Sequence, residues 1–244
     1  MNSRAKEDPI SSPKRLARIA GVLYLLVGIS GGFAQGFVYP KIYAAGDATT
    51  TAGNLVANSG LVRIGVIADL LDQTLWVFLA MILYRLLRQV HQSASFTMVV
   101  LVALGAGIAC LNAVFEFEGM RVATGAVSLA VGAGGTNALA LLMVDAQHYG
   151  LLIDTVFQGL WLMPLGYLAY KSGLFPKALG VLLVVGGVCY LLDVFAQFLA
   201  PDFGPRIATV VVIPSAIAEI SMVIYLLVIG VKTPKPVESI LAAA

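Results

Sequence analysis

The sequence predicts an all-α fold, a polytopic membrane helix bundle with six transmembrane helices and both termini in the cytoplasm. Of its 244 residues, 59% are hydrophobic and 11% are charged, whereas a soluble domain carries about 25% charged residues. The mean hydropathy is +0.93, and the apolar residues form six runs of about 20 residues, the length that a helix needs to cross a bilayer. These observations exclude an ordinary soluble enzyme, and a formal net charge of +2 gives no basic face for nucleic acid.

The chain begins with a polar, basic segment, residues 1–16, which we interpret as a cytoplasmic tail. The membrane domain follows over residues 17–231, and residues 232–244, with prolines at 234 and 236, are interpreted as a cytoplasmic C-terminal tail. The first apolar run is about 22 residues long, which exceeds the hydrophobic region of a cleaved signal peptide, so we expect a permanent helix. The six expected spans are 17–38, 64–84, 96–117, 150–170, 179–199 and 208–230.

The basic residues predict the orientation of the bundle, because cytoplasmic loops carry an excess of Lys and Arg. With six spans, eleven basic residues fall on the cytoplasmic side: Arg4, Lys6, Lys14, Arg15, Arg18, Arg85, Arg88, Lys171, Lys177, Lys232 and Lys235. Four fall on the outer side: Lys41, Arg63, Arg121 and Arg206. This asymmetry favours cytoplasmic termini.

Within residues 118–148, the stretch 121–144 is apolar but rich in glycine, and it could form a seventh span. A seventh span would invert every later loop and reduce the charge asymmetry from 11 against 4 to 8 against 7. We therefore expect an outer segment here, either a re-entrant piece or an interfacial helix that extends into the fourth span.

Five acidic residues lie inside the expected spans: Asp69, Asp72, Asp154, Asp193 and Glu219. A charged group in hydrocarbon is costly unless it faces a partner or water, so each acid requires a reason. Counted along the helices, all five lie in the outer half of the membrane or at its midplane, although the fifth span runs opposite to the second, fourth and sixth. This shared depth predicts one acidic pocket that opens toward the outside.

Three of the acids are followed one helical turn later by a glutamine, in the pairs Asp69–Gln73, Asp154–Gln158 and Asp193–Gln197. Trp76 and Trp161 lie on the same helix faces, seven residues after the first two acids, and could wall the pocket. Arg63 is the nearby outer cation, and it could pair with an acid on a neighbouring helix. The alternative is that these polar residues only hold helices together, which we favour for the glutamines.

The pattern predicts ligand binding rather than catalysis. The sequence contains two histidines, His91 and His148, so a zinc site of three histidines is excluded. Phosphate-loop, HExxH and GxSxG motifs are absent, and we expect no catalytic residue, metal or cofactor. Cys110 and Cys189 lie in apolar runs, where a thiol behaves as a small hydrophobe.

Our leading hypothesis is a protein that binds or transports a small cationic or protonatable solute. In this hypothesis Asp193 and Glu219 are the central groups, and Asp69 and Asp72 lie opposite them. The alternatives are a membrane enzyme that uses the carboxylates with a divalent metal, and an accessory membrane subunit with no ligand. The sequence makes no prediction of oligomeric state.

Several segments together resemble a known family. They are KRLARIAG at 14–21, GD at 46–47, TAGN at 51–54, Arg63-x-Gly65 with Asp69, LYRLL at 83–87, GLWLMPLGY at 159–167, GLFPKALG at 173–180, and Pro214 with Glu219. This combination resembles the bacterial membrane proteins of domain-of-unknown-function family 4386. The resemblance implies a six-helix protein of the bacterial inner membrane, and it brings no catalytic residues because no activity is established for the family.

Overall fold

The computed structural model describes residues 12–127, 130 and 132–232, so most of the predicted N-terminal tail and almost all of the C-terminal tail lie outside the described residues. The elements are α1 (Pro13–Gly31), the π-helical segment η1 (Gly32–Val38), α2 (Tyr39–Ile42), α3 (Ala48–Ala57), α4 (Ser59–Leu87), α5 (Gln92–Ala123), α6 (Ala133–Ser172), α7 (Lys177–Leu199) and α8 (Gly204–Val228).

Six helical segments in the described part of the chain are long and apolar enough to cross a membrane. They are Pro13–Ile42, which joins α1, η1 and α2, then Ser59–Leu87, Gln92–Ala123, Ala133–Ser172, Lys177–Leu199 and Arg206–Val228. The predicted all-α fold with six spans is therefore confirmed, and the protein is a multi-pass membrane protein.

Most helices extend beyond the apolar runs that predict them. α5 continues to Ala123, and α6 begins at Ala133 and runs for 40 residues to Ser172. Residues 133–148 are therefore part of the same continuous helix as the fourth span. Hydropathy marks only the apolar part of a helix, whereas the hydrogen-bonded backbone continues until a capping residue or a turn ends it.

The ends of the helices follow ordinary capping rules. Ser12 caps α1, where its side chain accepts a hydrogen bond from the Arg15 backbone N at 3.3 Å, and Pro13 follows it. His91 caps α5 through Nδ1, which accepts from the Ala94 backbone N at 3.1 Å. α6 ends at Gly173, whose φ of +68° places it in the left-handed region that glycine tolerates.

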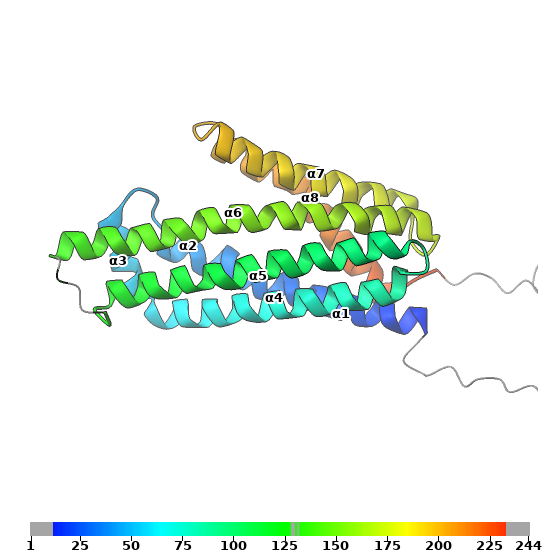
Figure 1. Cartoon of the computed structure of the whole chain (residues 1–244), viewed down its shortest axis with the longest axis horizontal. Coiled ribbons are helices and arrows are strands. Elements are labelled where there is room, and N and C mark those ends of the chain that lie inside the picture. The colour runs from blue at the N-terminus through cyan, green and yellow to red at the C-terminus, as the bar shows by residue number, and fades with distance from the viewer. Residues whose placement is uncertain (1–11, 128–129, 131, 233–244) are drawn as a thin grey trace, which may run out of the picture.

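The six spans form a ring in which each packs against its neighbours, in the order α1, α4, α5, α6, α7, α8 and back to α1. Figure 1 shows α3 at one end of the bundle, which we call the α3 end. α1 begins and α8 finishes at the opposite end, which we call the terminal end. There, the Lys232 backbone N donates to the Leu174 carbonyl at 3.0 Å, which ties the last described residue to the loop after α6.

The first span changes its helical winding halfway along. η1 has π-helical geometry, and at its end the Tyr39 backbone N donates to the Ala34 carbonyl, five residues earlier. A π-helical turn rotates the side chains that follow it and is frequent at functional sites. Here it determines the direction of Gln35, whose role is described below.

Two apolar clusters form the interior of the bundle. The larger lies toward the terminal end and contains Leu83, Met98, Leu165 and Leu183 among its fully buried members. The smaller lies at the α3 end and consists of Ile42, Ala52, Leu55, Val62, Met120, Val122, Ala140 and Val144. Between these clusters, α4, α5 and α6 each carry polar side chains in the interior of the bundle, among them Gln73, Asn112 and Asp154.

Candidate functional site

A polar layer between the two apolar clusters surrounds a cavity of about 430 Å³. All six spans contribute to its lining, from α1 with η1 through to α8. The polar residues that line it are Tyr24, Gln35, Asp69, Asp72, Gln73, Asn112, Gln147, Asp154, Thr155, Gln158, Tyr190 and Glu219. The cavity therefore gathers four carboxylates from three helices.

Asp69 and Asp72 project from one face of α4 and are held by side chains of the first span. Gln35 of η1 donates from Nε2 to both carboxylate oxygens of Asp69, at 3.0 and 2.9 Å. Ser30 Oγ donates to Asp72 Oδ1 at 3.3 Å, and Gln73 Nε2 donates to Asp72 Oδ2 at 2.9 Å. The carboxylates of α4 are thus oriented by side chains of the protein itself.

Glu219 of α8 accepts hydrogen bonds from two tyrosines on different helices. The Tyr24 hydroxyl of α1 donates to Oε2 at 2.6 Å, and the Tyr190 hydroxyl of α7 donates to Oε1 at 2.8 Å. Short hydrogen bonds to a carboxylate are among the stronger ones in proteins. Glu219 therefore fastens α1, α7 and α8 together where the cavity meets the larger apolar cluster.

Asp154 of α6 is almost completely buried, with 1% of its surface exposed. Gln158 Nε2 donates to Asp154 Oδ2 at 3.0 Å, whereas Oδ1 has no hydrogen-bond partner among the described residues. Gly105 of α5 makes room for this oxygen, since a Cβ at that position would lie 2.8 Å from Oδ1. A buried carboxylate oxygen without a donor is unusual because its desolvation is costly.

Three amide side chains around the cavity also have an unpartnered polar atom among the described residues: Gln73 Oε1, Asn112 Nδ2 and Gln147 Oε1. All three side chains are at least nine-tenths buried. Gln147 uses its Nε2 to donate to the buried carboxylate of Glu116 at 3.1 Å. Of the unpartnered atoms in the described lining, Asp154 Oδ1, Gln73 Oε1 and Gln147 Oε1 are acceptors and Asn112 Nδ2 is a donor, so acceptors predominate.

Aromatic rings form the wall of the cavity toward the larger apolar cluster. The rings of Trp76 and Trp161 meet edge to face with centroids 5.7 Å apart, and Tyr24 lies 5.7 Å from Trp161. Both tryptophans of the chain line the cavity. They combine an apolar surface with a π face that attracts cations.

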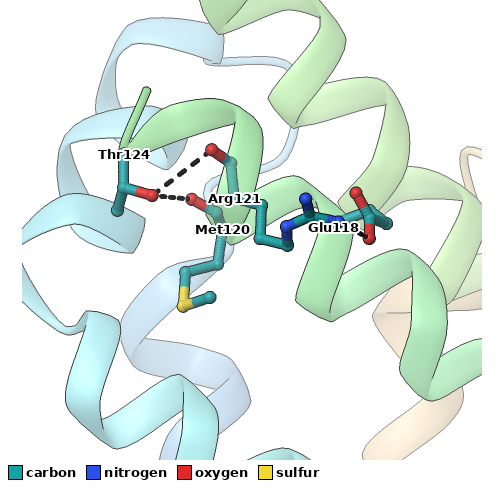
Figure 2. A network of polar contacts seen from close by, with 4 residues as sticks. All are labelled: Glu118, Met120, Arg121 and Thr124. Atoms are coloured by element: carbon teal, nitrogen blue, oxygen red, sulfur yellow. Dashed lines mark hydrogen bonds and ion pairs between the residues drawn. The ribbon is translucent and has the colours of Figure 1, made fainter. Parts of the chain in front are cut away.

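The lining contains no Lys, Arg or His among the residues that the structure describes. Arg63 lies over the Phe117 ring, with its guanidinium carbon 5.7 Å from the centroid. Figure 2 shows that Arg121 pairs with Glu118, one turn earlier on α5, while the Thr124 hydroxyl donates to the backbone carbonyls of Met120 and Arg121. Neither arginine neutralises the cavity.

Metal coordination finds little support in this arrangement. In the described part of the chain, no three Asp, Glu, His or Cys side chains are grouped closely enough to hold a metal ion. Each of the cavity carboxylates has its own amide or hydroxyl donors.

A sequence comparison identifies the family. The family described as Domain of unknown function (DUF4386) matches residues 19–230, which include most of the first span, the other five spans and every residue of the cavity lining. The chain belongs to the DUF4386 family. No curated protein and no solved structure matches it.

In this DUF4386 member, six of the nine predicted site residues line the cavity: Asp69, Asp72, Gln73, Asp154, Gln158 and Glu219. The other three, Arg63, Asp193 and Gln197, are not among the lining residues. Asp193 is 5% exposed and accepts from Gln197 Nε2 at 2.9 Å, so this pair forms a separate polar contact on α7.

The sequence did not single out several lining residues of this DUF4386 protein as site residues. Gln35, Tyr24 and Tyr190 hold the carboxylates, and Asn112 and Gln147 present unpartnered amide atoms. The signal for Gln35 was its place as a polar residue in an apolar run. The tyrosines gave no such signal, because tyrosine is common near membrane interfaces.

Proposed function

We propose that this multi-pass membrane protein binds a small organic cation in the cavity of the polar layer. The observation that carries the proposal is the convergence of Asp69, Asp72, Asp154 and Glu219 on one cavity with no basic side chain in its described lining. Carboxylates at this depth are costly unless they meet a counter-charge or water. A bound cation supplies that charge.

The unpartnered acceptors favour a cation that donates hydrogen bonds. Asp154 Oδ1, Gln73 Oε1 and Gln147 Oε1 all lack a donor among the described residues. A primary ammonium group has three donors and no acceptor, so it matches this set. A carboxylate or phosphate ligand would add acceptors to a lining already rich in them.

The size and the aromatic wall fit an organic rather than an inorganic cation. A volume of about 430 Å³ lies within the range of small-molecule sites, roughly 300–1,000 Å³. Trp76 and Trp161 add apolar surface and a cation–π contribution. The cationic group would lie toward the carboxylates and the organic part against the rings.

The test measures binding of n-butylammonium to the purified protein in phosphatidylcholine nanodiscs, with intrinsic fluorescence as the readout. Both tryptophans line the cavity, so the emission reports on this site. We expect n-butylammonium to bind, and n-butanol and butyrate of the same chain length to bind much more weakly.

Two variants assign the binding to the carboxylates. Asp154→Asn and Glu219→Gln should each weaken n-butylammonium binding by about thirtyfold or more, because removing a buried charged partner costs ~2 kcal/mol or more. Asp202→Asn is the matched control, because Asp202 is an exposed acid in the turn between α7 and α8. Equal binding of the three probes, or unchanged binding in both cavity variants, would overturn the proposal.

A further inference from the structure

The packing between the first span and α8 changes abruptly along the length of the two helices. Toward the terminal end it is closed, because a Cβ on Gly21 would lie 2.9 Å from the Leu227 backbone N. The contact continues to the hydrogen bond between Tyr24 and Glu219. Beyond that point, no described heavy atom lies within 4 Å of a Cβ placed on Gly28 or Gly32.

Gly28 and Gly32 are exposed, and both also line the cavity. The side of the cavity formed by α1 and η1 therefore reaches the surface of the bundle directly beside these two glycines. In the same region η1 packs against α1, α2 and α4, so its opposite face is left uncovered.

The α7–α8 hairpin leaves this side open. α7 packs closely against α6 at two glycine pairs, Gly166 with Gly180 and Gly159 with Gly187. A Cβ added to any of these glycines would lie within 2.8 Å of the carbonyl oxygen of the facing glycine. Beyond these contacts the backbones of α6 and α7 diverge (Figure 1), and the ring centroids of Tyr149 and Phe198 lie 6.2 Å apart across the gap between the helices. Leu192 and Leu199, near the tip, are 56% and 82% exposed.

The opening lies at a depth where the bundle exposes apolar side chains. On α1, Leu25 and Ile29 flank Gly28 and are 43% and 59% exposed. On α8, Ile217 and Ile220 flank Glu219 and are 51% and 59% exposed. Exposed aliphatic residues on both helices that border an opening in a membrane helix bundle indicate that it faces lipid chains rather than water.

We propose that the ligand is a single-chain amphiphile with a cationic head group. The head group lies in the cavity against Asp72, Asp154 and Glu219, and its alkyl chain leaves between α1 and α8, past Gly28 and Gly32, into the bilayer. This inference rests on the proposed cation site. It is carried by two observations, the convergence of four carboxylates on a cavity with no basic side chain in its described lining, and the opening of that cavity beside Gly28 and Gly32 at the depth of lipid-facing residues.

The experiment compares n-butylammonium with dodecylammonium in phosphatidylcholine nanodiscs, with dodecanol and dodecanoate as neutral and anionic probes of equal length. Dodecylammonium, at its concentration in the bilayer, should displace n-butylammonium, whereas dodecanol and dodecanoate should not. A site closed to the chain would bind n-butylammonium and exclude dodecylammonium.

Gly32→Leu fills the opening without a steric clash, since its Cβ meets open space. We expect this variant to weaken dodecylammonium binding by about tenfold more than it weakens n-butylammonium binding, because the added side chain occupies the path of the alkyl chain. Gly36→Leu is the matched control, because Gly36 lies one turn further along, is equally open and does not line the cavity.

The outcomes separate this inference from the proposed function. If n-butylammonium does not bind, the cation site itself is wrong. If n-butylammonium binds but dodecylammonium does not, or if Gly32→Leu and Gly36→Leu affect dodecylammonium equally, the lateral route is wrong and the cation site stands.

Discussion

Glu219 is the residue at which three helices meet, because its two oxygens accept from Tyr24 on α1 and Tyr190 on α7. Polar contacts between membrane helices contribute about 0.6 kcal/mol on average and up to about 1.7 kcal/mol. A carboxylate bonded at 2.6 Å by a buried tyrosine belongs in the upper part of that range.

A double-mutant cycle of Tyr24→Phe and Glu219→Leu tests this assignment. We expect a coupling free energy of roughly 1–1.7 kcal/mol in unfolding experiments in mixed micelles, since each single variant removes the same hydrogen bond. Tyr149→Phe is the control, because Tyr149 is 54% exposed and should show no coupling with Glu219. A coupling near zero for Tyr24 would mean that Glu219 does not fasten α1 to α8.

At the scale of residues, the sequence predicts the carboxylates better than the groups that hold them. An acid in an apolar run is conspicuous, and Asp69, Asp72, Asp154 and Glu219 all line the cavity. Their partners are distant in sequence: Gln35 is 34 residues from Asp69, and Tyr24 is 195 residues from Glu219. Only the packing of the helices brings such pairs together.

Asp193 shows the limit of arguments from depth alone. It lies in the same half of the membrane as the other acids and has the same glutamine spacing as Asp69 and Asp154, but it lies on α7 beyond the close glycine contacts with α6. Depth is fixed by counting residues, whereas the direction that a helix face points depends on how the helix tilts and packs.

At the scale of elements, the N-terminus of α3 is stabilised by one capping residue, Asp47. The Asp47 carboxylate accepts from the Thr50 backbone N at 2.9 Å and from the Thr50 hydroxyl at 2.7 Å. These hydrogen bonds, the backbone one above all, hold the pKa of Asp47 below its usual value. A lowered pKa means that the ionised cap favours the folded helix.

The order of α3 should therefore depend on pH. The contribution of Asp47 is fully present above about pH 4, the usual pKa of an aspartate, and is lost as the pH falls through its lowered pKa in the folded protein. Hydrogen exchange of the α3 amides, corrected for intrinsic rates, should accelerate in that acidic range. Asp47→Asn keeps a capping side chain without a titratable group, so its α3 should lack this acceleration. If Asp47→Asn showed the same acceleration at acidic pH, a group other than Asp47 would be its cause.

Helix ends are the part of each element that hydropathy predicted least well. The fourth apolar run begins at residue 150, whereas α6 begins at Ala133, because Gly134 and Gly135 dilute the apolar signal without ending the helix. α1 is likewise continued by η1, a change of winding that leaves no mark in hydropathy. Backbone hydrogen bonding, rather than side-chain polarity, decides both cases.

At the scale of the molecule, the ring of six spans separates the basic residues into two groups. At the terminal end the described chain carries Lys14, Arg15, Arg18, Arg85, Arg88, Lys171, Lys177 and Lys232. At the α3 end it carries Lys41, Arg63, Arg121 and Arg206. Because cytoplasmic surfaces hold the excess of positive charge, we expect the terminal end to face the cytoplasm and the α3 end to face outward.

Cysteine accessibility tests this orientation in a background with Cys110→Ala and Cys189→Ala, which removes both native thiols. Asp202 lies in the turn between α7 and α8, and Gln89 in the turn between α4 and α5, at opposite ends of the bundle, and both are exposed. A membrane-impermeant maleimide should label Asp202→Cys in intact spheroplasts and Gln89→Cys only after the membrane is opened, while both label equally in detergent. The reverse pattern would place the termini outside. In either orientation the lateral opening beside Gly28 and Gly32 stays at the depth of lipid-facing side chains, so an amphiphile could still reach the acidic cavity from within the bilayer.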